Sequence, residues 1–108
     1  MNNIMTLLRI REATPSADPN ADFTLALVLT DGSEVQRDVT FLLNGPVFDA
    51  IKANRGLFIQ VRAEDGTVLW PNGADLDPDV LIWGGPPPED ASATPPKHLT
   101  PRLPARTA

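Results

Sequence analysis

Three aspartates at alternate positions are the first residues whose types and spacing suggest chemistry. Asp75, Asp77 and Asp79 are spaced like the first ligands of a calcium-binding loop. Such a loop also needs glycine at its sixth position and a bidentate glutamate at its twelfth. Val80 and Pro86 stand there instead. We therefore expect a helix start in place of a metal site, with Asp77 as the N-cap and Asp79 in the first turn.

The other groups able to catalyse a reaction are isolated in the sequence. His98 is the only histidine, and it lies in a proline-rich stretch where no second group would hold it in catalytic geometry. Glu64 and Asp65 lie beside a predicted hairpin turn, where we expect their carboxylates to be solvated. The absence of cysteine excludes thiolate zinc sites and thiol nucleophiles. We predict that the protein is not an enzyme and has no catalytic, cofactor-binding or metal-binding residue.

Two tryptophans are the strongest candidates for contact with another molecule. Trp70 ends a predicted strand and Trp83 ends a predicted helix. We favour the interpretation that both close the core, and the alternative is that they are partly exposed anchors for a partner. The segment from Trp70 to Asp79 is either a structural joint or a recognition surface. The candidate partner-binding residues are Trp70, Pro71, Asn72, Asp75 and Trp83.

Short strands and helices must position these residues. Residues 23–30 alternate large apolar side chains with smaller ones, which is the clearest strand pattern in the chain. Asp31-Gly32 and Asp65-Gly66 predict hairpin turns, because a type I′ turn needs positive φ at both central residues. Pro46 predicts the first position of a helix. The predicted elements are strands at 4–11, 23–30 and 34–39, a helix from 46 to about 54, strands at 57–63 and 67–70, and a helix at 78–83, with a loop at 12–22.

This order of elements predicts an α+β fold. Three strands, a helix, two strands and a short helix follow one another, and the tight turns make neighbouring strands antiparallel. A helix does not follow each strand, so a parallel doubly wound sheet is not expected. We predict a two-layer domain over residues 1–83 that contains an antiparallel sheet.

The last part of the chain has a different composition. Seven of the twelve prolines follow Trp83, and Leu99 and Leu103 are the only large apolar side chains there. Such a segment buries too little surface to offset its ordering entropy. We therefore predict a disordered proline-rich tail over residues 84–108.

Charge and composition narrow the classes of partner. Residues 1–83 carry six Lys or Arg against twelve Asp or Glu. An acidic domain repels phosphate backbones, so we expect no direct nucleic-acid binding and a basic protein partner. The N-terminal apolar run at 4–8 is too short for a signal peptide, and no stretch reaches the ~20 residues of a membrane helix. We expect a cytoplasmic protein without membrane contact.

The run Thr67–Leu81, which includes Trp-Pro-Asn-Gly-Ala-Asp, resembles the signature of a family of small bacterial proteins, domain-of-unknown-function family 2442. Pro46–Arg62 is similar to the segment that precedes that signature, and Asp31–Leu43 resembles an earlier hairpin. The resemblance implies a two-layer α+β fold and no established catalytic residues. Members are often encoded beside another small protein, which implies a toxin–antitoxin-like or other paired role. Some members carry a C-terminal helix-turn-helix, which the proline-rich tail here does not match.

Three function classes follow from these features. We expect a non-enzymatic protein-interaction module, as the acidic member of a two-gene pair. The alternative is a transcription-regulatory accessory that acts at DNA through a partner. A second alternative is an enzyme that uses carboxylates the sequence does not single out.

Overall fold

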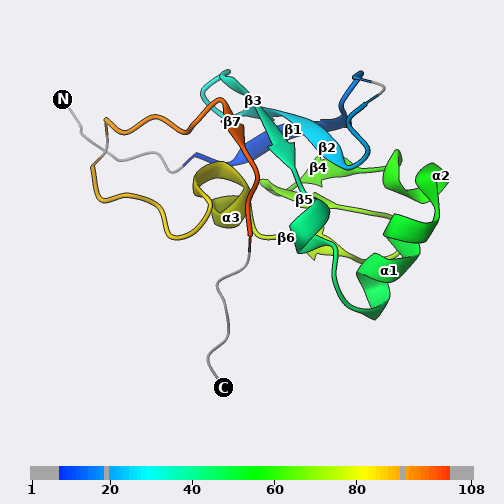
Figure 1. Ribbon diagram of the computed structural model, residues 1–108. Helices are drawn as coiled ribbons and strands as arrows, with labels where there is room; N and C mark the ends of the chain where they lie inside the picture. Colours follow the sequence, from blue (N-terminus) through cyan, green and yellow to red (C-terminus); the bar gives the residue numbers. More distant parts are fainter. Residues whose placement is uncertain (1–7, 19, 91, 103–108) are drawn as a thin grey trace.

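A computed structural model describes residues 8–18, 20–90 and 92–102. Figure 1 shows strands and short helices in a mixed α+β arrangement, so the predicted fold class is confirmed. The elements are β1 (Ile10–Pro15), β2 (Thr24–Leu29), β3 (Glu34–Asp38), the 3-10 helix η1 (Thr40–Leu42), α1 (Pro46–Ala53), α2 (Arg55–Phe58), β4 (Arg62–Glu64), β5 (Thr67–Leu69), β6 (Asp75–Leu76), α3 (Pro78–Trp83) and β7 (His98–Leu99).

The first sheet has the order β1-β2-β3-β7. The inner strand β2 shows the predicted alternation, with Leu25, Leu27 and Leu29 buried on one face. The strand β1 corrects the predicted loop at 12–22, because its backbone pairs with β2 as far as Pro15 and Leu25. Buried Ala13 continues the inward face of β1, and the loop begins only at Ser16.

The second sheet has the order β4-β5-β6, and its strands β4 and β5 contact β1 of the first sheet. Asp65 and Gly66 have φ angles of 53° and 83°, which confirms a hairpin turn with two positive φ values between β4 and β5. Ile10 N donates to Gly66 O at 3.0 Å and links the two sheets. The single antiparallel sheet expected from the sequence is therefore two small sheets, of which the first has β7 as a parallel edge.

Two local expectations differ from the structure. The strand expected at 57–63 begins only at Arg62, because Asn54 caps the short helix α2 by accepting a bond from Leu57 N. Phe58, the last residue of this helix, is completely buried. The hairpin predicted at Asp31-Gly32 is confirmed by the antiparallel pairing of β2 and β3. Only Gly32 has positive φ, so the turn is not of type I′. The Asp31 carboxylate instead accepts bonds from Ser33 N and Oγ.

The core lies where the helices meet the sheets. Phe58 and Trp70 pack with ring centroids 6.2 Å apart, and Phe48 from α1 meets Trp70 edge-on at 6.4 Å. Helix α1 begins at Pro46 as predicted, after Gly45 with a φ of 100°. Helix α3 spans the predicted residues, with Asp77 as its N-cap. None of the helices in the described ranges combines the length and apolarity required to cross a bilayer.

The tail is irregular over most of its length but not throughout. From Gly84 to Lys97 the described residues form no helix or strand, as the proline content predicts. His98–Leu99 nevertheless forms β7, paired in parallel with Gln36 and Arg37 of β3, and Pro101 is buried. Residues 103–108 lie outside the described part of the chain. The expectation of disorder is thus corrected for the segment that reaches β3.

Candidate functional site

Trp70 lies inside the domain. Only 1% of its surface is exposed, and its indole Nε1 donates to Phe58 O at 3.0 Å. A buried tryptophan with a satisfied N–H stabilises the core and offers no surface to a partner. Trp83 is half-buried and packs against the same core. Of the two interpretations of the tryptophans, the structural one therefore applies to Trp70.

The turn after Trp70 is held by its own hydrogen bonds. Asn72 donates through Nδ2 to Val47 O at 3.0 Å, and its Oδ1 accepts from Ala74 N at 3.2 Å. Trp70 N donates to Ala74 O at 2.9 Å and closes the turn. Pro71 and Asn72 are exposed, but the Asn72 side chain is engaged in joining this turn to α1. The specific Trp-Pro-Asn-Gly-Ala-Asp run thus has a structural explanation over its first five residues.

Asp75, at the end of that run, lines an apolar groove. The groove encloses about 160 Å³ between η1, α1, β6 and α3. Its lining residues are Leu42, Phe48, Asp75, Leu76, Asp77 and Val80. Each of two further apolar side chains is adjacent in sequence to a lining residue and is exposed: Phe41 at 45% and Val47 at 41%. Of the five partner-binding candidates, Asp75 lines the groove. The apolar lining residues were not among the candidates.

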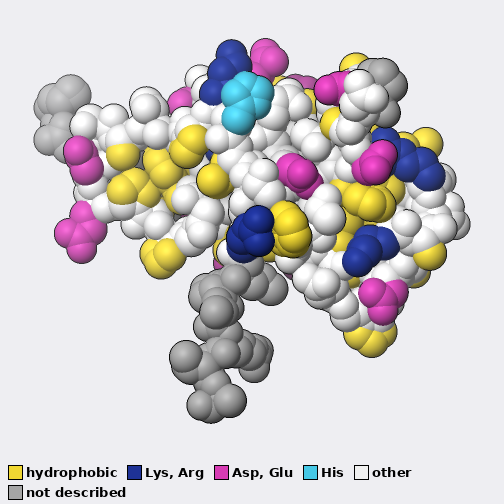
Figure 2. Space-filling model, in the orientation of Figure 1, with side chains coloured by type: hydrophobic (Ala, Val, Ile, Leu, Met, Phe, Trp, Pro, Cys, Tyr) yellow, Lys and Arg dark blue, Asp and Glu magenta, His cyan; other side chains and the backbone are white. Residues whose placement is uncertain are grey.

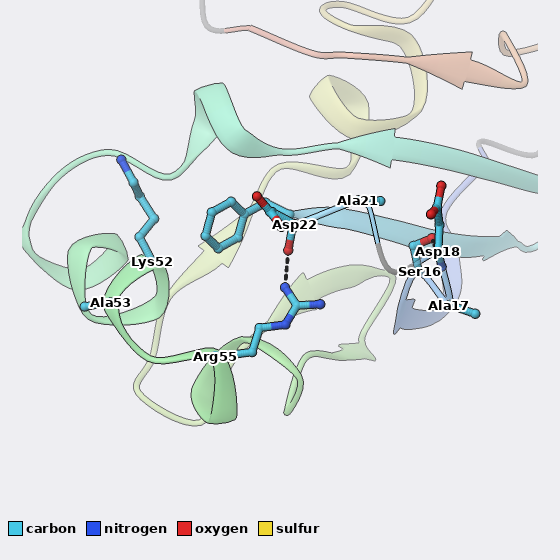
Figure 3. Close-up of a pocket in the computed structure, with 9 residues that line it drawn as sticks. Ser16, Ala17, Asp18, Ala21, Asp22, Lys52, Ala53 and Arg55 are labelled. Atoms are coloured by element: carbon cyan, nitrogen blue, oxygen red, sulfur yellow. Dashed lines mark hydrogen bonds between the residues drawn. The ribbon is translucent and has the colours of Figure 1, made fainter.

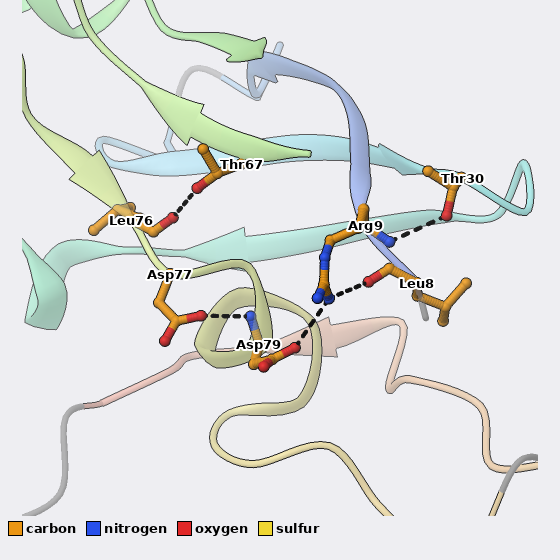
Figure 4. A network of polar contacts seen from close by, with 7 residues as sticks. All are labelled: Leu8, Arg9, Thr30, Thr67, Leu76, Asp77 and Asp79. Carbon is orange, nitrogen blue, oxygen red and sulfur yellow. Dashed lines mark hydrogen bonds and ion pairs between the residues drawn. The ribbon is translucent and has the colours of Figure 1, made fainter. Parts of the chain in front are cut away.

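The aspartates near the groove have separate structural roles. Asp77 Oδ1 accepts from Asp79 N at 2.9 Å and caps α3, as predicted. Asp79 pairs with Arg9 of the segment before β1, with Nη1 and Oδ1 3.4 Å apart (Figure 4). Thr67 Oγ1 donates to Leu76 O at 2.5 Å and fixes β6 against β5. Within the described ranges, no group of three His, Cys, Asp or Glu residues is placed to hold a metal ion.

A second, more open hollow lies between the 16–23 loop and the helices α1 and α2 (Figure 3). It encloses about 510 Å³ and is lined by Ser16, Ala17, Asp18, Ala21, Asp22, Phe23, Lys52, Ala53 and Arg55. Two acidic and two basic side chains line it, so its electrostatic potential does not have a single sign. Arg55 donates to Asp22 O and lies over the Phe58 ring at 4.7 Å. Its contacts tie the loop to α2, so this hollow has a structural basis and no converging catalytic groups.

The most unusual polar residue is Arg37, whose surface is 0% exposed. Its guanidinium donates to five backbone carbonyls and to no carboxylate. Nε donates to Leu81 O at 2.5 Å, and Nη2 donates to Ile82 O at 3.0 Å and Pro96 O at 2.7 Å. Nη1 donates to Gln36 O at 2.7 Å and Lys97 O at 3.3 Å. Because a guanidinium has five N–H donors, every one of them has an acceptor.

This arrangement joins three parts of the chain at one buried charge. The carbonyls come from β3, from the last turn of α3 and from the tail just before β7. Carbonyls at a helix C-terminus carry partial negative charge, which suits a cation. Burial lowers the pKa of Arg37 to about 10, so the guanidinium is still charged at neutral pH. The burial of Arg37 could have been predicted from the alternation of the strand. Arg37 lies two residues from both Val35 and Val39, so its side chain shares their inward face.

Comparison with known proteins adds a family and no function. The chain has no significant match among curated proteins or solved structures. Residues 15–87 match the sequence profile of a family described as "Protein of unknown function (DUF2442)". This match covers more than half of the chain, from the end of β1 to the first residues after α3. The protein therefore belongs to the DUF2442 family.

Proposed function

We propose that this protein is a non-enzymatic interaction module that binds a partner protein through the apolar groove between η1, α1, β6 and α3. The observation that carries the proposal is the composition of the groove. Four apolar side chains line it, and two carboxylates, Asp75 and Asp77, stand among them. A concave apolar site with a few charged groups is typical of recognition of a side chain from another molecule.

Two exposed apolar side chains belong to η1 and α1, which are among the elements that form the groove. Phe41 and Val47 are among the exposed large hydrophobic residues of the described chain, and each is next in sequence to a groove residue. Exposed aromatic and aliphatic side chains are the composition expected of an interface centre. One face of the Phe41 ring is covered by the Arg102 guanidinium at 4.0 Å, so a partner would contact the rest of the ring. The turn at Asn72 holds α1 in place beside the groove through Val47 O. This hydrogen bond therefore ties α1 to the turn that leads into β6, and both elements form part of the groove.

Charge indicates the chemistry of the partner. Of the six Lys and Arg residues in positions 1–83, Arg37 is buried, so the surface is more acidic than the count suggests. Asp75 is exposed at the groove and has no part in capping α3. A partner segment with an apolar side chain next to Lys or Arg would fit this combination. On this proposal the protein is the acidic member of a bacterial two-gene pair and works in the cytoplasm.

The proposal is tested by capture from a lysate of the native host with two groove variants and a matched control. Val80→Asp places a charge in the apolar wall, and Asp75→Lys reverses the exposed carboxylate. Ile59→Asp is the control, because Ile59 is 52% exposed and does not line the groove. We expect a protein that the wild type and Ile59→Asp retain and that both groove variants lose. Equal retention by all four folded proteins would exclude the groove as the binding site.

A further inference from the structure

The described part of the tail ends beside the apolar groove. A Cβ placed on Gly84, the C-cap of α3, would lie 3.3 Å from Leu99 Cδ2, so β7 runs against the end of that helix. Three residues later, the Arg102 guanidinium lies over the Phe41 ring at 4.0 Å. Phe41 belongs to η1 and precedes Leu42, which lines the groove. The tail therefore passes from α3 to η1, which are two of the four elements that form the groove.

The contact between Arg102 and Phe41 already places a basic group of the tail on the surface that we assign to a partner. A guanidinium over an aromatic face is an attractive cation–π contact. Pro101 is buried, so the tail lies on the domain up to this contact. Figure 2 shows a basic side chain lying against a hydrophobic one at the place where the chain leaves β7 in Figure 1. The tail thus supplies the basic chemistry that the proposed function expects of a partner.

The residues that follow Arg102 have a composition that suits the groove. Leu103 is the one large apolar side chain after Arg102, and Arg106 is three residues further on. The groove has apolar walls with two carboxylates, Asp75 and Asp77, and encloses about 160 Å³. Small-molecule pockets usually have about 300–1,000 Å³, so a groove of this size suits a single side chain. A leucine with arginines on both sides matches the groove in polarity and in charge.

The groove is also within reach of this leucine. Leu103 follows directly on Arg102, and groove residue Leu42 follows directly on Phe41, the contact of Arg102. The six residues 103–108 span up to roughly 20 Å when extended. A short flexible connection gives a local concentration in the mM range. Docking in the same chain is therefore favoured over docking of a free peptide at lower concentration.

We propose that residues 102–106 of this chain are an internal ligand of the groove, with Leu103 between the apolar walls, Arg102 on Phe41 and Arg106 near Asp75. The inference rests on the proposed function, because it assigns a regulator to the same site. A partner then has to displace the tail, and its apparent affinity is reduced by the fraction of chains in which the groove is open. For a free segment with a dissociation constant of about 0.1 mM, a local concentration of about 1 mM leaves roughly a tenth of the grooves open.

A labelled peptide with the sequence of residues 101–108 is the probe, and full-length chains are the receptors. Leu103→Asp in the receptor removes the internal ligand. Thr94→Asp is the matched control, because it makes the same change of charge at an exposed position between α3 and β7. Fluorescence anisotropy measures the binding of the peptide to each receptor. We expect the Leu103→Asp chain to bind the peptide about tenfold more tightly than the wild type or the Thr94→Asp chain, and equal binding to all three receptors overturns the proposal.

Further substitutions in the Leu103→Asp chain locate the peptide on the groove. Adding Asp75→Lys is expected to weaken its binding at least about tenfold. Adding Glu34→Lys is expected to change it less than about twofold, because Glu34 is exposed on β3 and does not line the groove. Equal weakening by both would show attraction by net charge and overturn the proposal. As a second readout, the NMR signal of the Val80 amide should differ between the wild type and the Leu103→Asp chain, and an unchanged signal also overturns it.

This inference and the proposed function can fail separately. Retention of a host protein by the groove, which Val80→Asp tests, does not depend on the tail sequence. If the groove variants lose that protein but the peptide binds no receptor, the internal ligand alone is refuted. If all variants retain the host protein, the proposed function is refuted, and the peptide titration still decides whether the tail occupies the groove.

Discussion

Replacing Arg37 by alanine tests the account of how the domain and its tail are held together. The change removes five hydrogen bonds from a charged donor, and such bonds contribute about 1.5–3 kcal/mol each when measured singly. Their sum is not the expected loss. The carbonyls of Pro96 and Lys97 regain water when the tail detaches, whereas those of Leu81 and Ile82 stay in a buried site. We therefore expect Arg37→Ala to lower the free energy of unfolding by about 3–5 kcal/mol.

Urea unfolding followed by tryptophan fluorescence measures this loss. For a domain of this size, a change of 3–5 kcal/mol corresponds to a midpoint shift of roughly 2 M. Arg11→Ala is the matched control, because Arg11 is exposed on β1, and its expected change is within about 0.5 kcal/mol. Arg37→Lys should lose an intermediate amount, since an ammonium has three donors and no planar fork. A loss below about 1 kcal/mol for Arg37→Ala would refute the reasoning.

Three further predictions concern single interactions. Trp70→Ala should lower the free energy of unfolding by ~3–5 kcal/mol, because the ring is buried. Trp70→Phe should lower it by ~1–3 kcal/mol, because phenylalanine fills most of the space but leaves Phe58 O unpaired. Thermal unfolding of both variants measures these losses. Asp77→Ala should cost ~1 kcal/mol while Asp77→Asn stays within a few tenths, which calorimetry can distinguish, and equal losses would contradict a capping role. Hydrogen bonds from the Ser33 hydroxyl and amide lower the pKa of Asp31, so its stabilising effect is present above its ordinary pKa of 3.8 and is lost as pH falls through the lowered pKa. Ser33→Ala should raise the pKa of Asp31 in an NMR titration, and an unchanged pKa would remove the hydroxyl as the principal cause.

Local sequence signals predicted the elements whose formation depends on nearby residues. The alternation through Leu25, Leu27 and Leu29 predicted β2, and the Asp77-Pro78 start predicted α3 with its correct bounds. These features depend on periodicity and capping, which are readable in a short window. The hairpin turn at Asp65-Gly66 was also predicted locally, because both residue types tolerate positive φ.

The features that the sequence did not predict depend on distant parts of the chain. β7 has two residues and exists because Gln36 and Arg37, about sixty positions earlier, bind the carbonyls before it. The groove unites side chains from η1, α1, β6 and α3, so no local pattern contains it. Asp75 was identified through the unusual run in which it lies, whereas Val80 looked like an ordinary helix residue.

The affinity of a captured partner for charge variants tests the central claim most directly. Asp75→Lys reverses a carboxylate that lines the groove, and Glu34→Lys makes the same change at an exposed position on β3 that does not line it. Dissociation constants for the wild type and both variants would be measured by isothermal titration calorimetry at two salt concentrations. We expect Asp75→Lys to weaken binding at least about tenfold at low salt, by ~1.4 kcal/mol, and Glu34→Lys to change it less than about twofold. Equal effects of the two substitutions would show that the partner responds to net charge alone, and would contradict recognition at the groove.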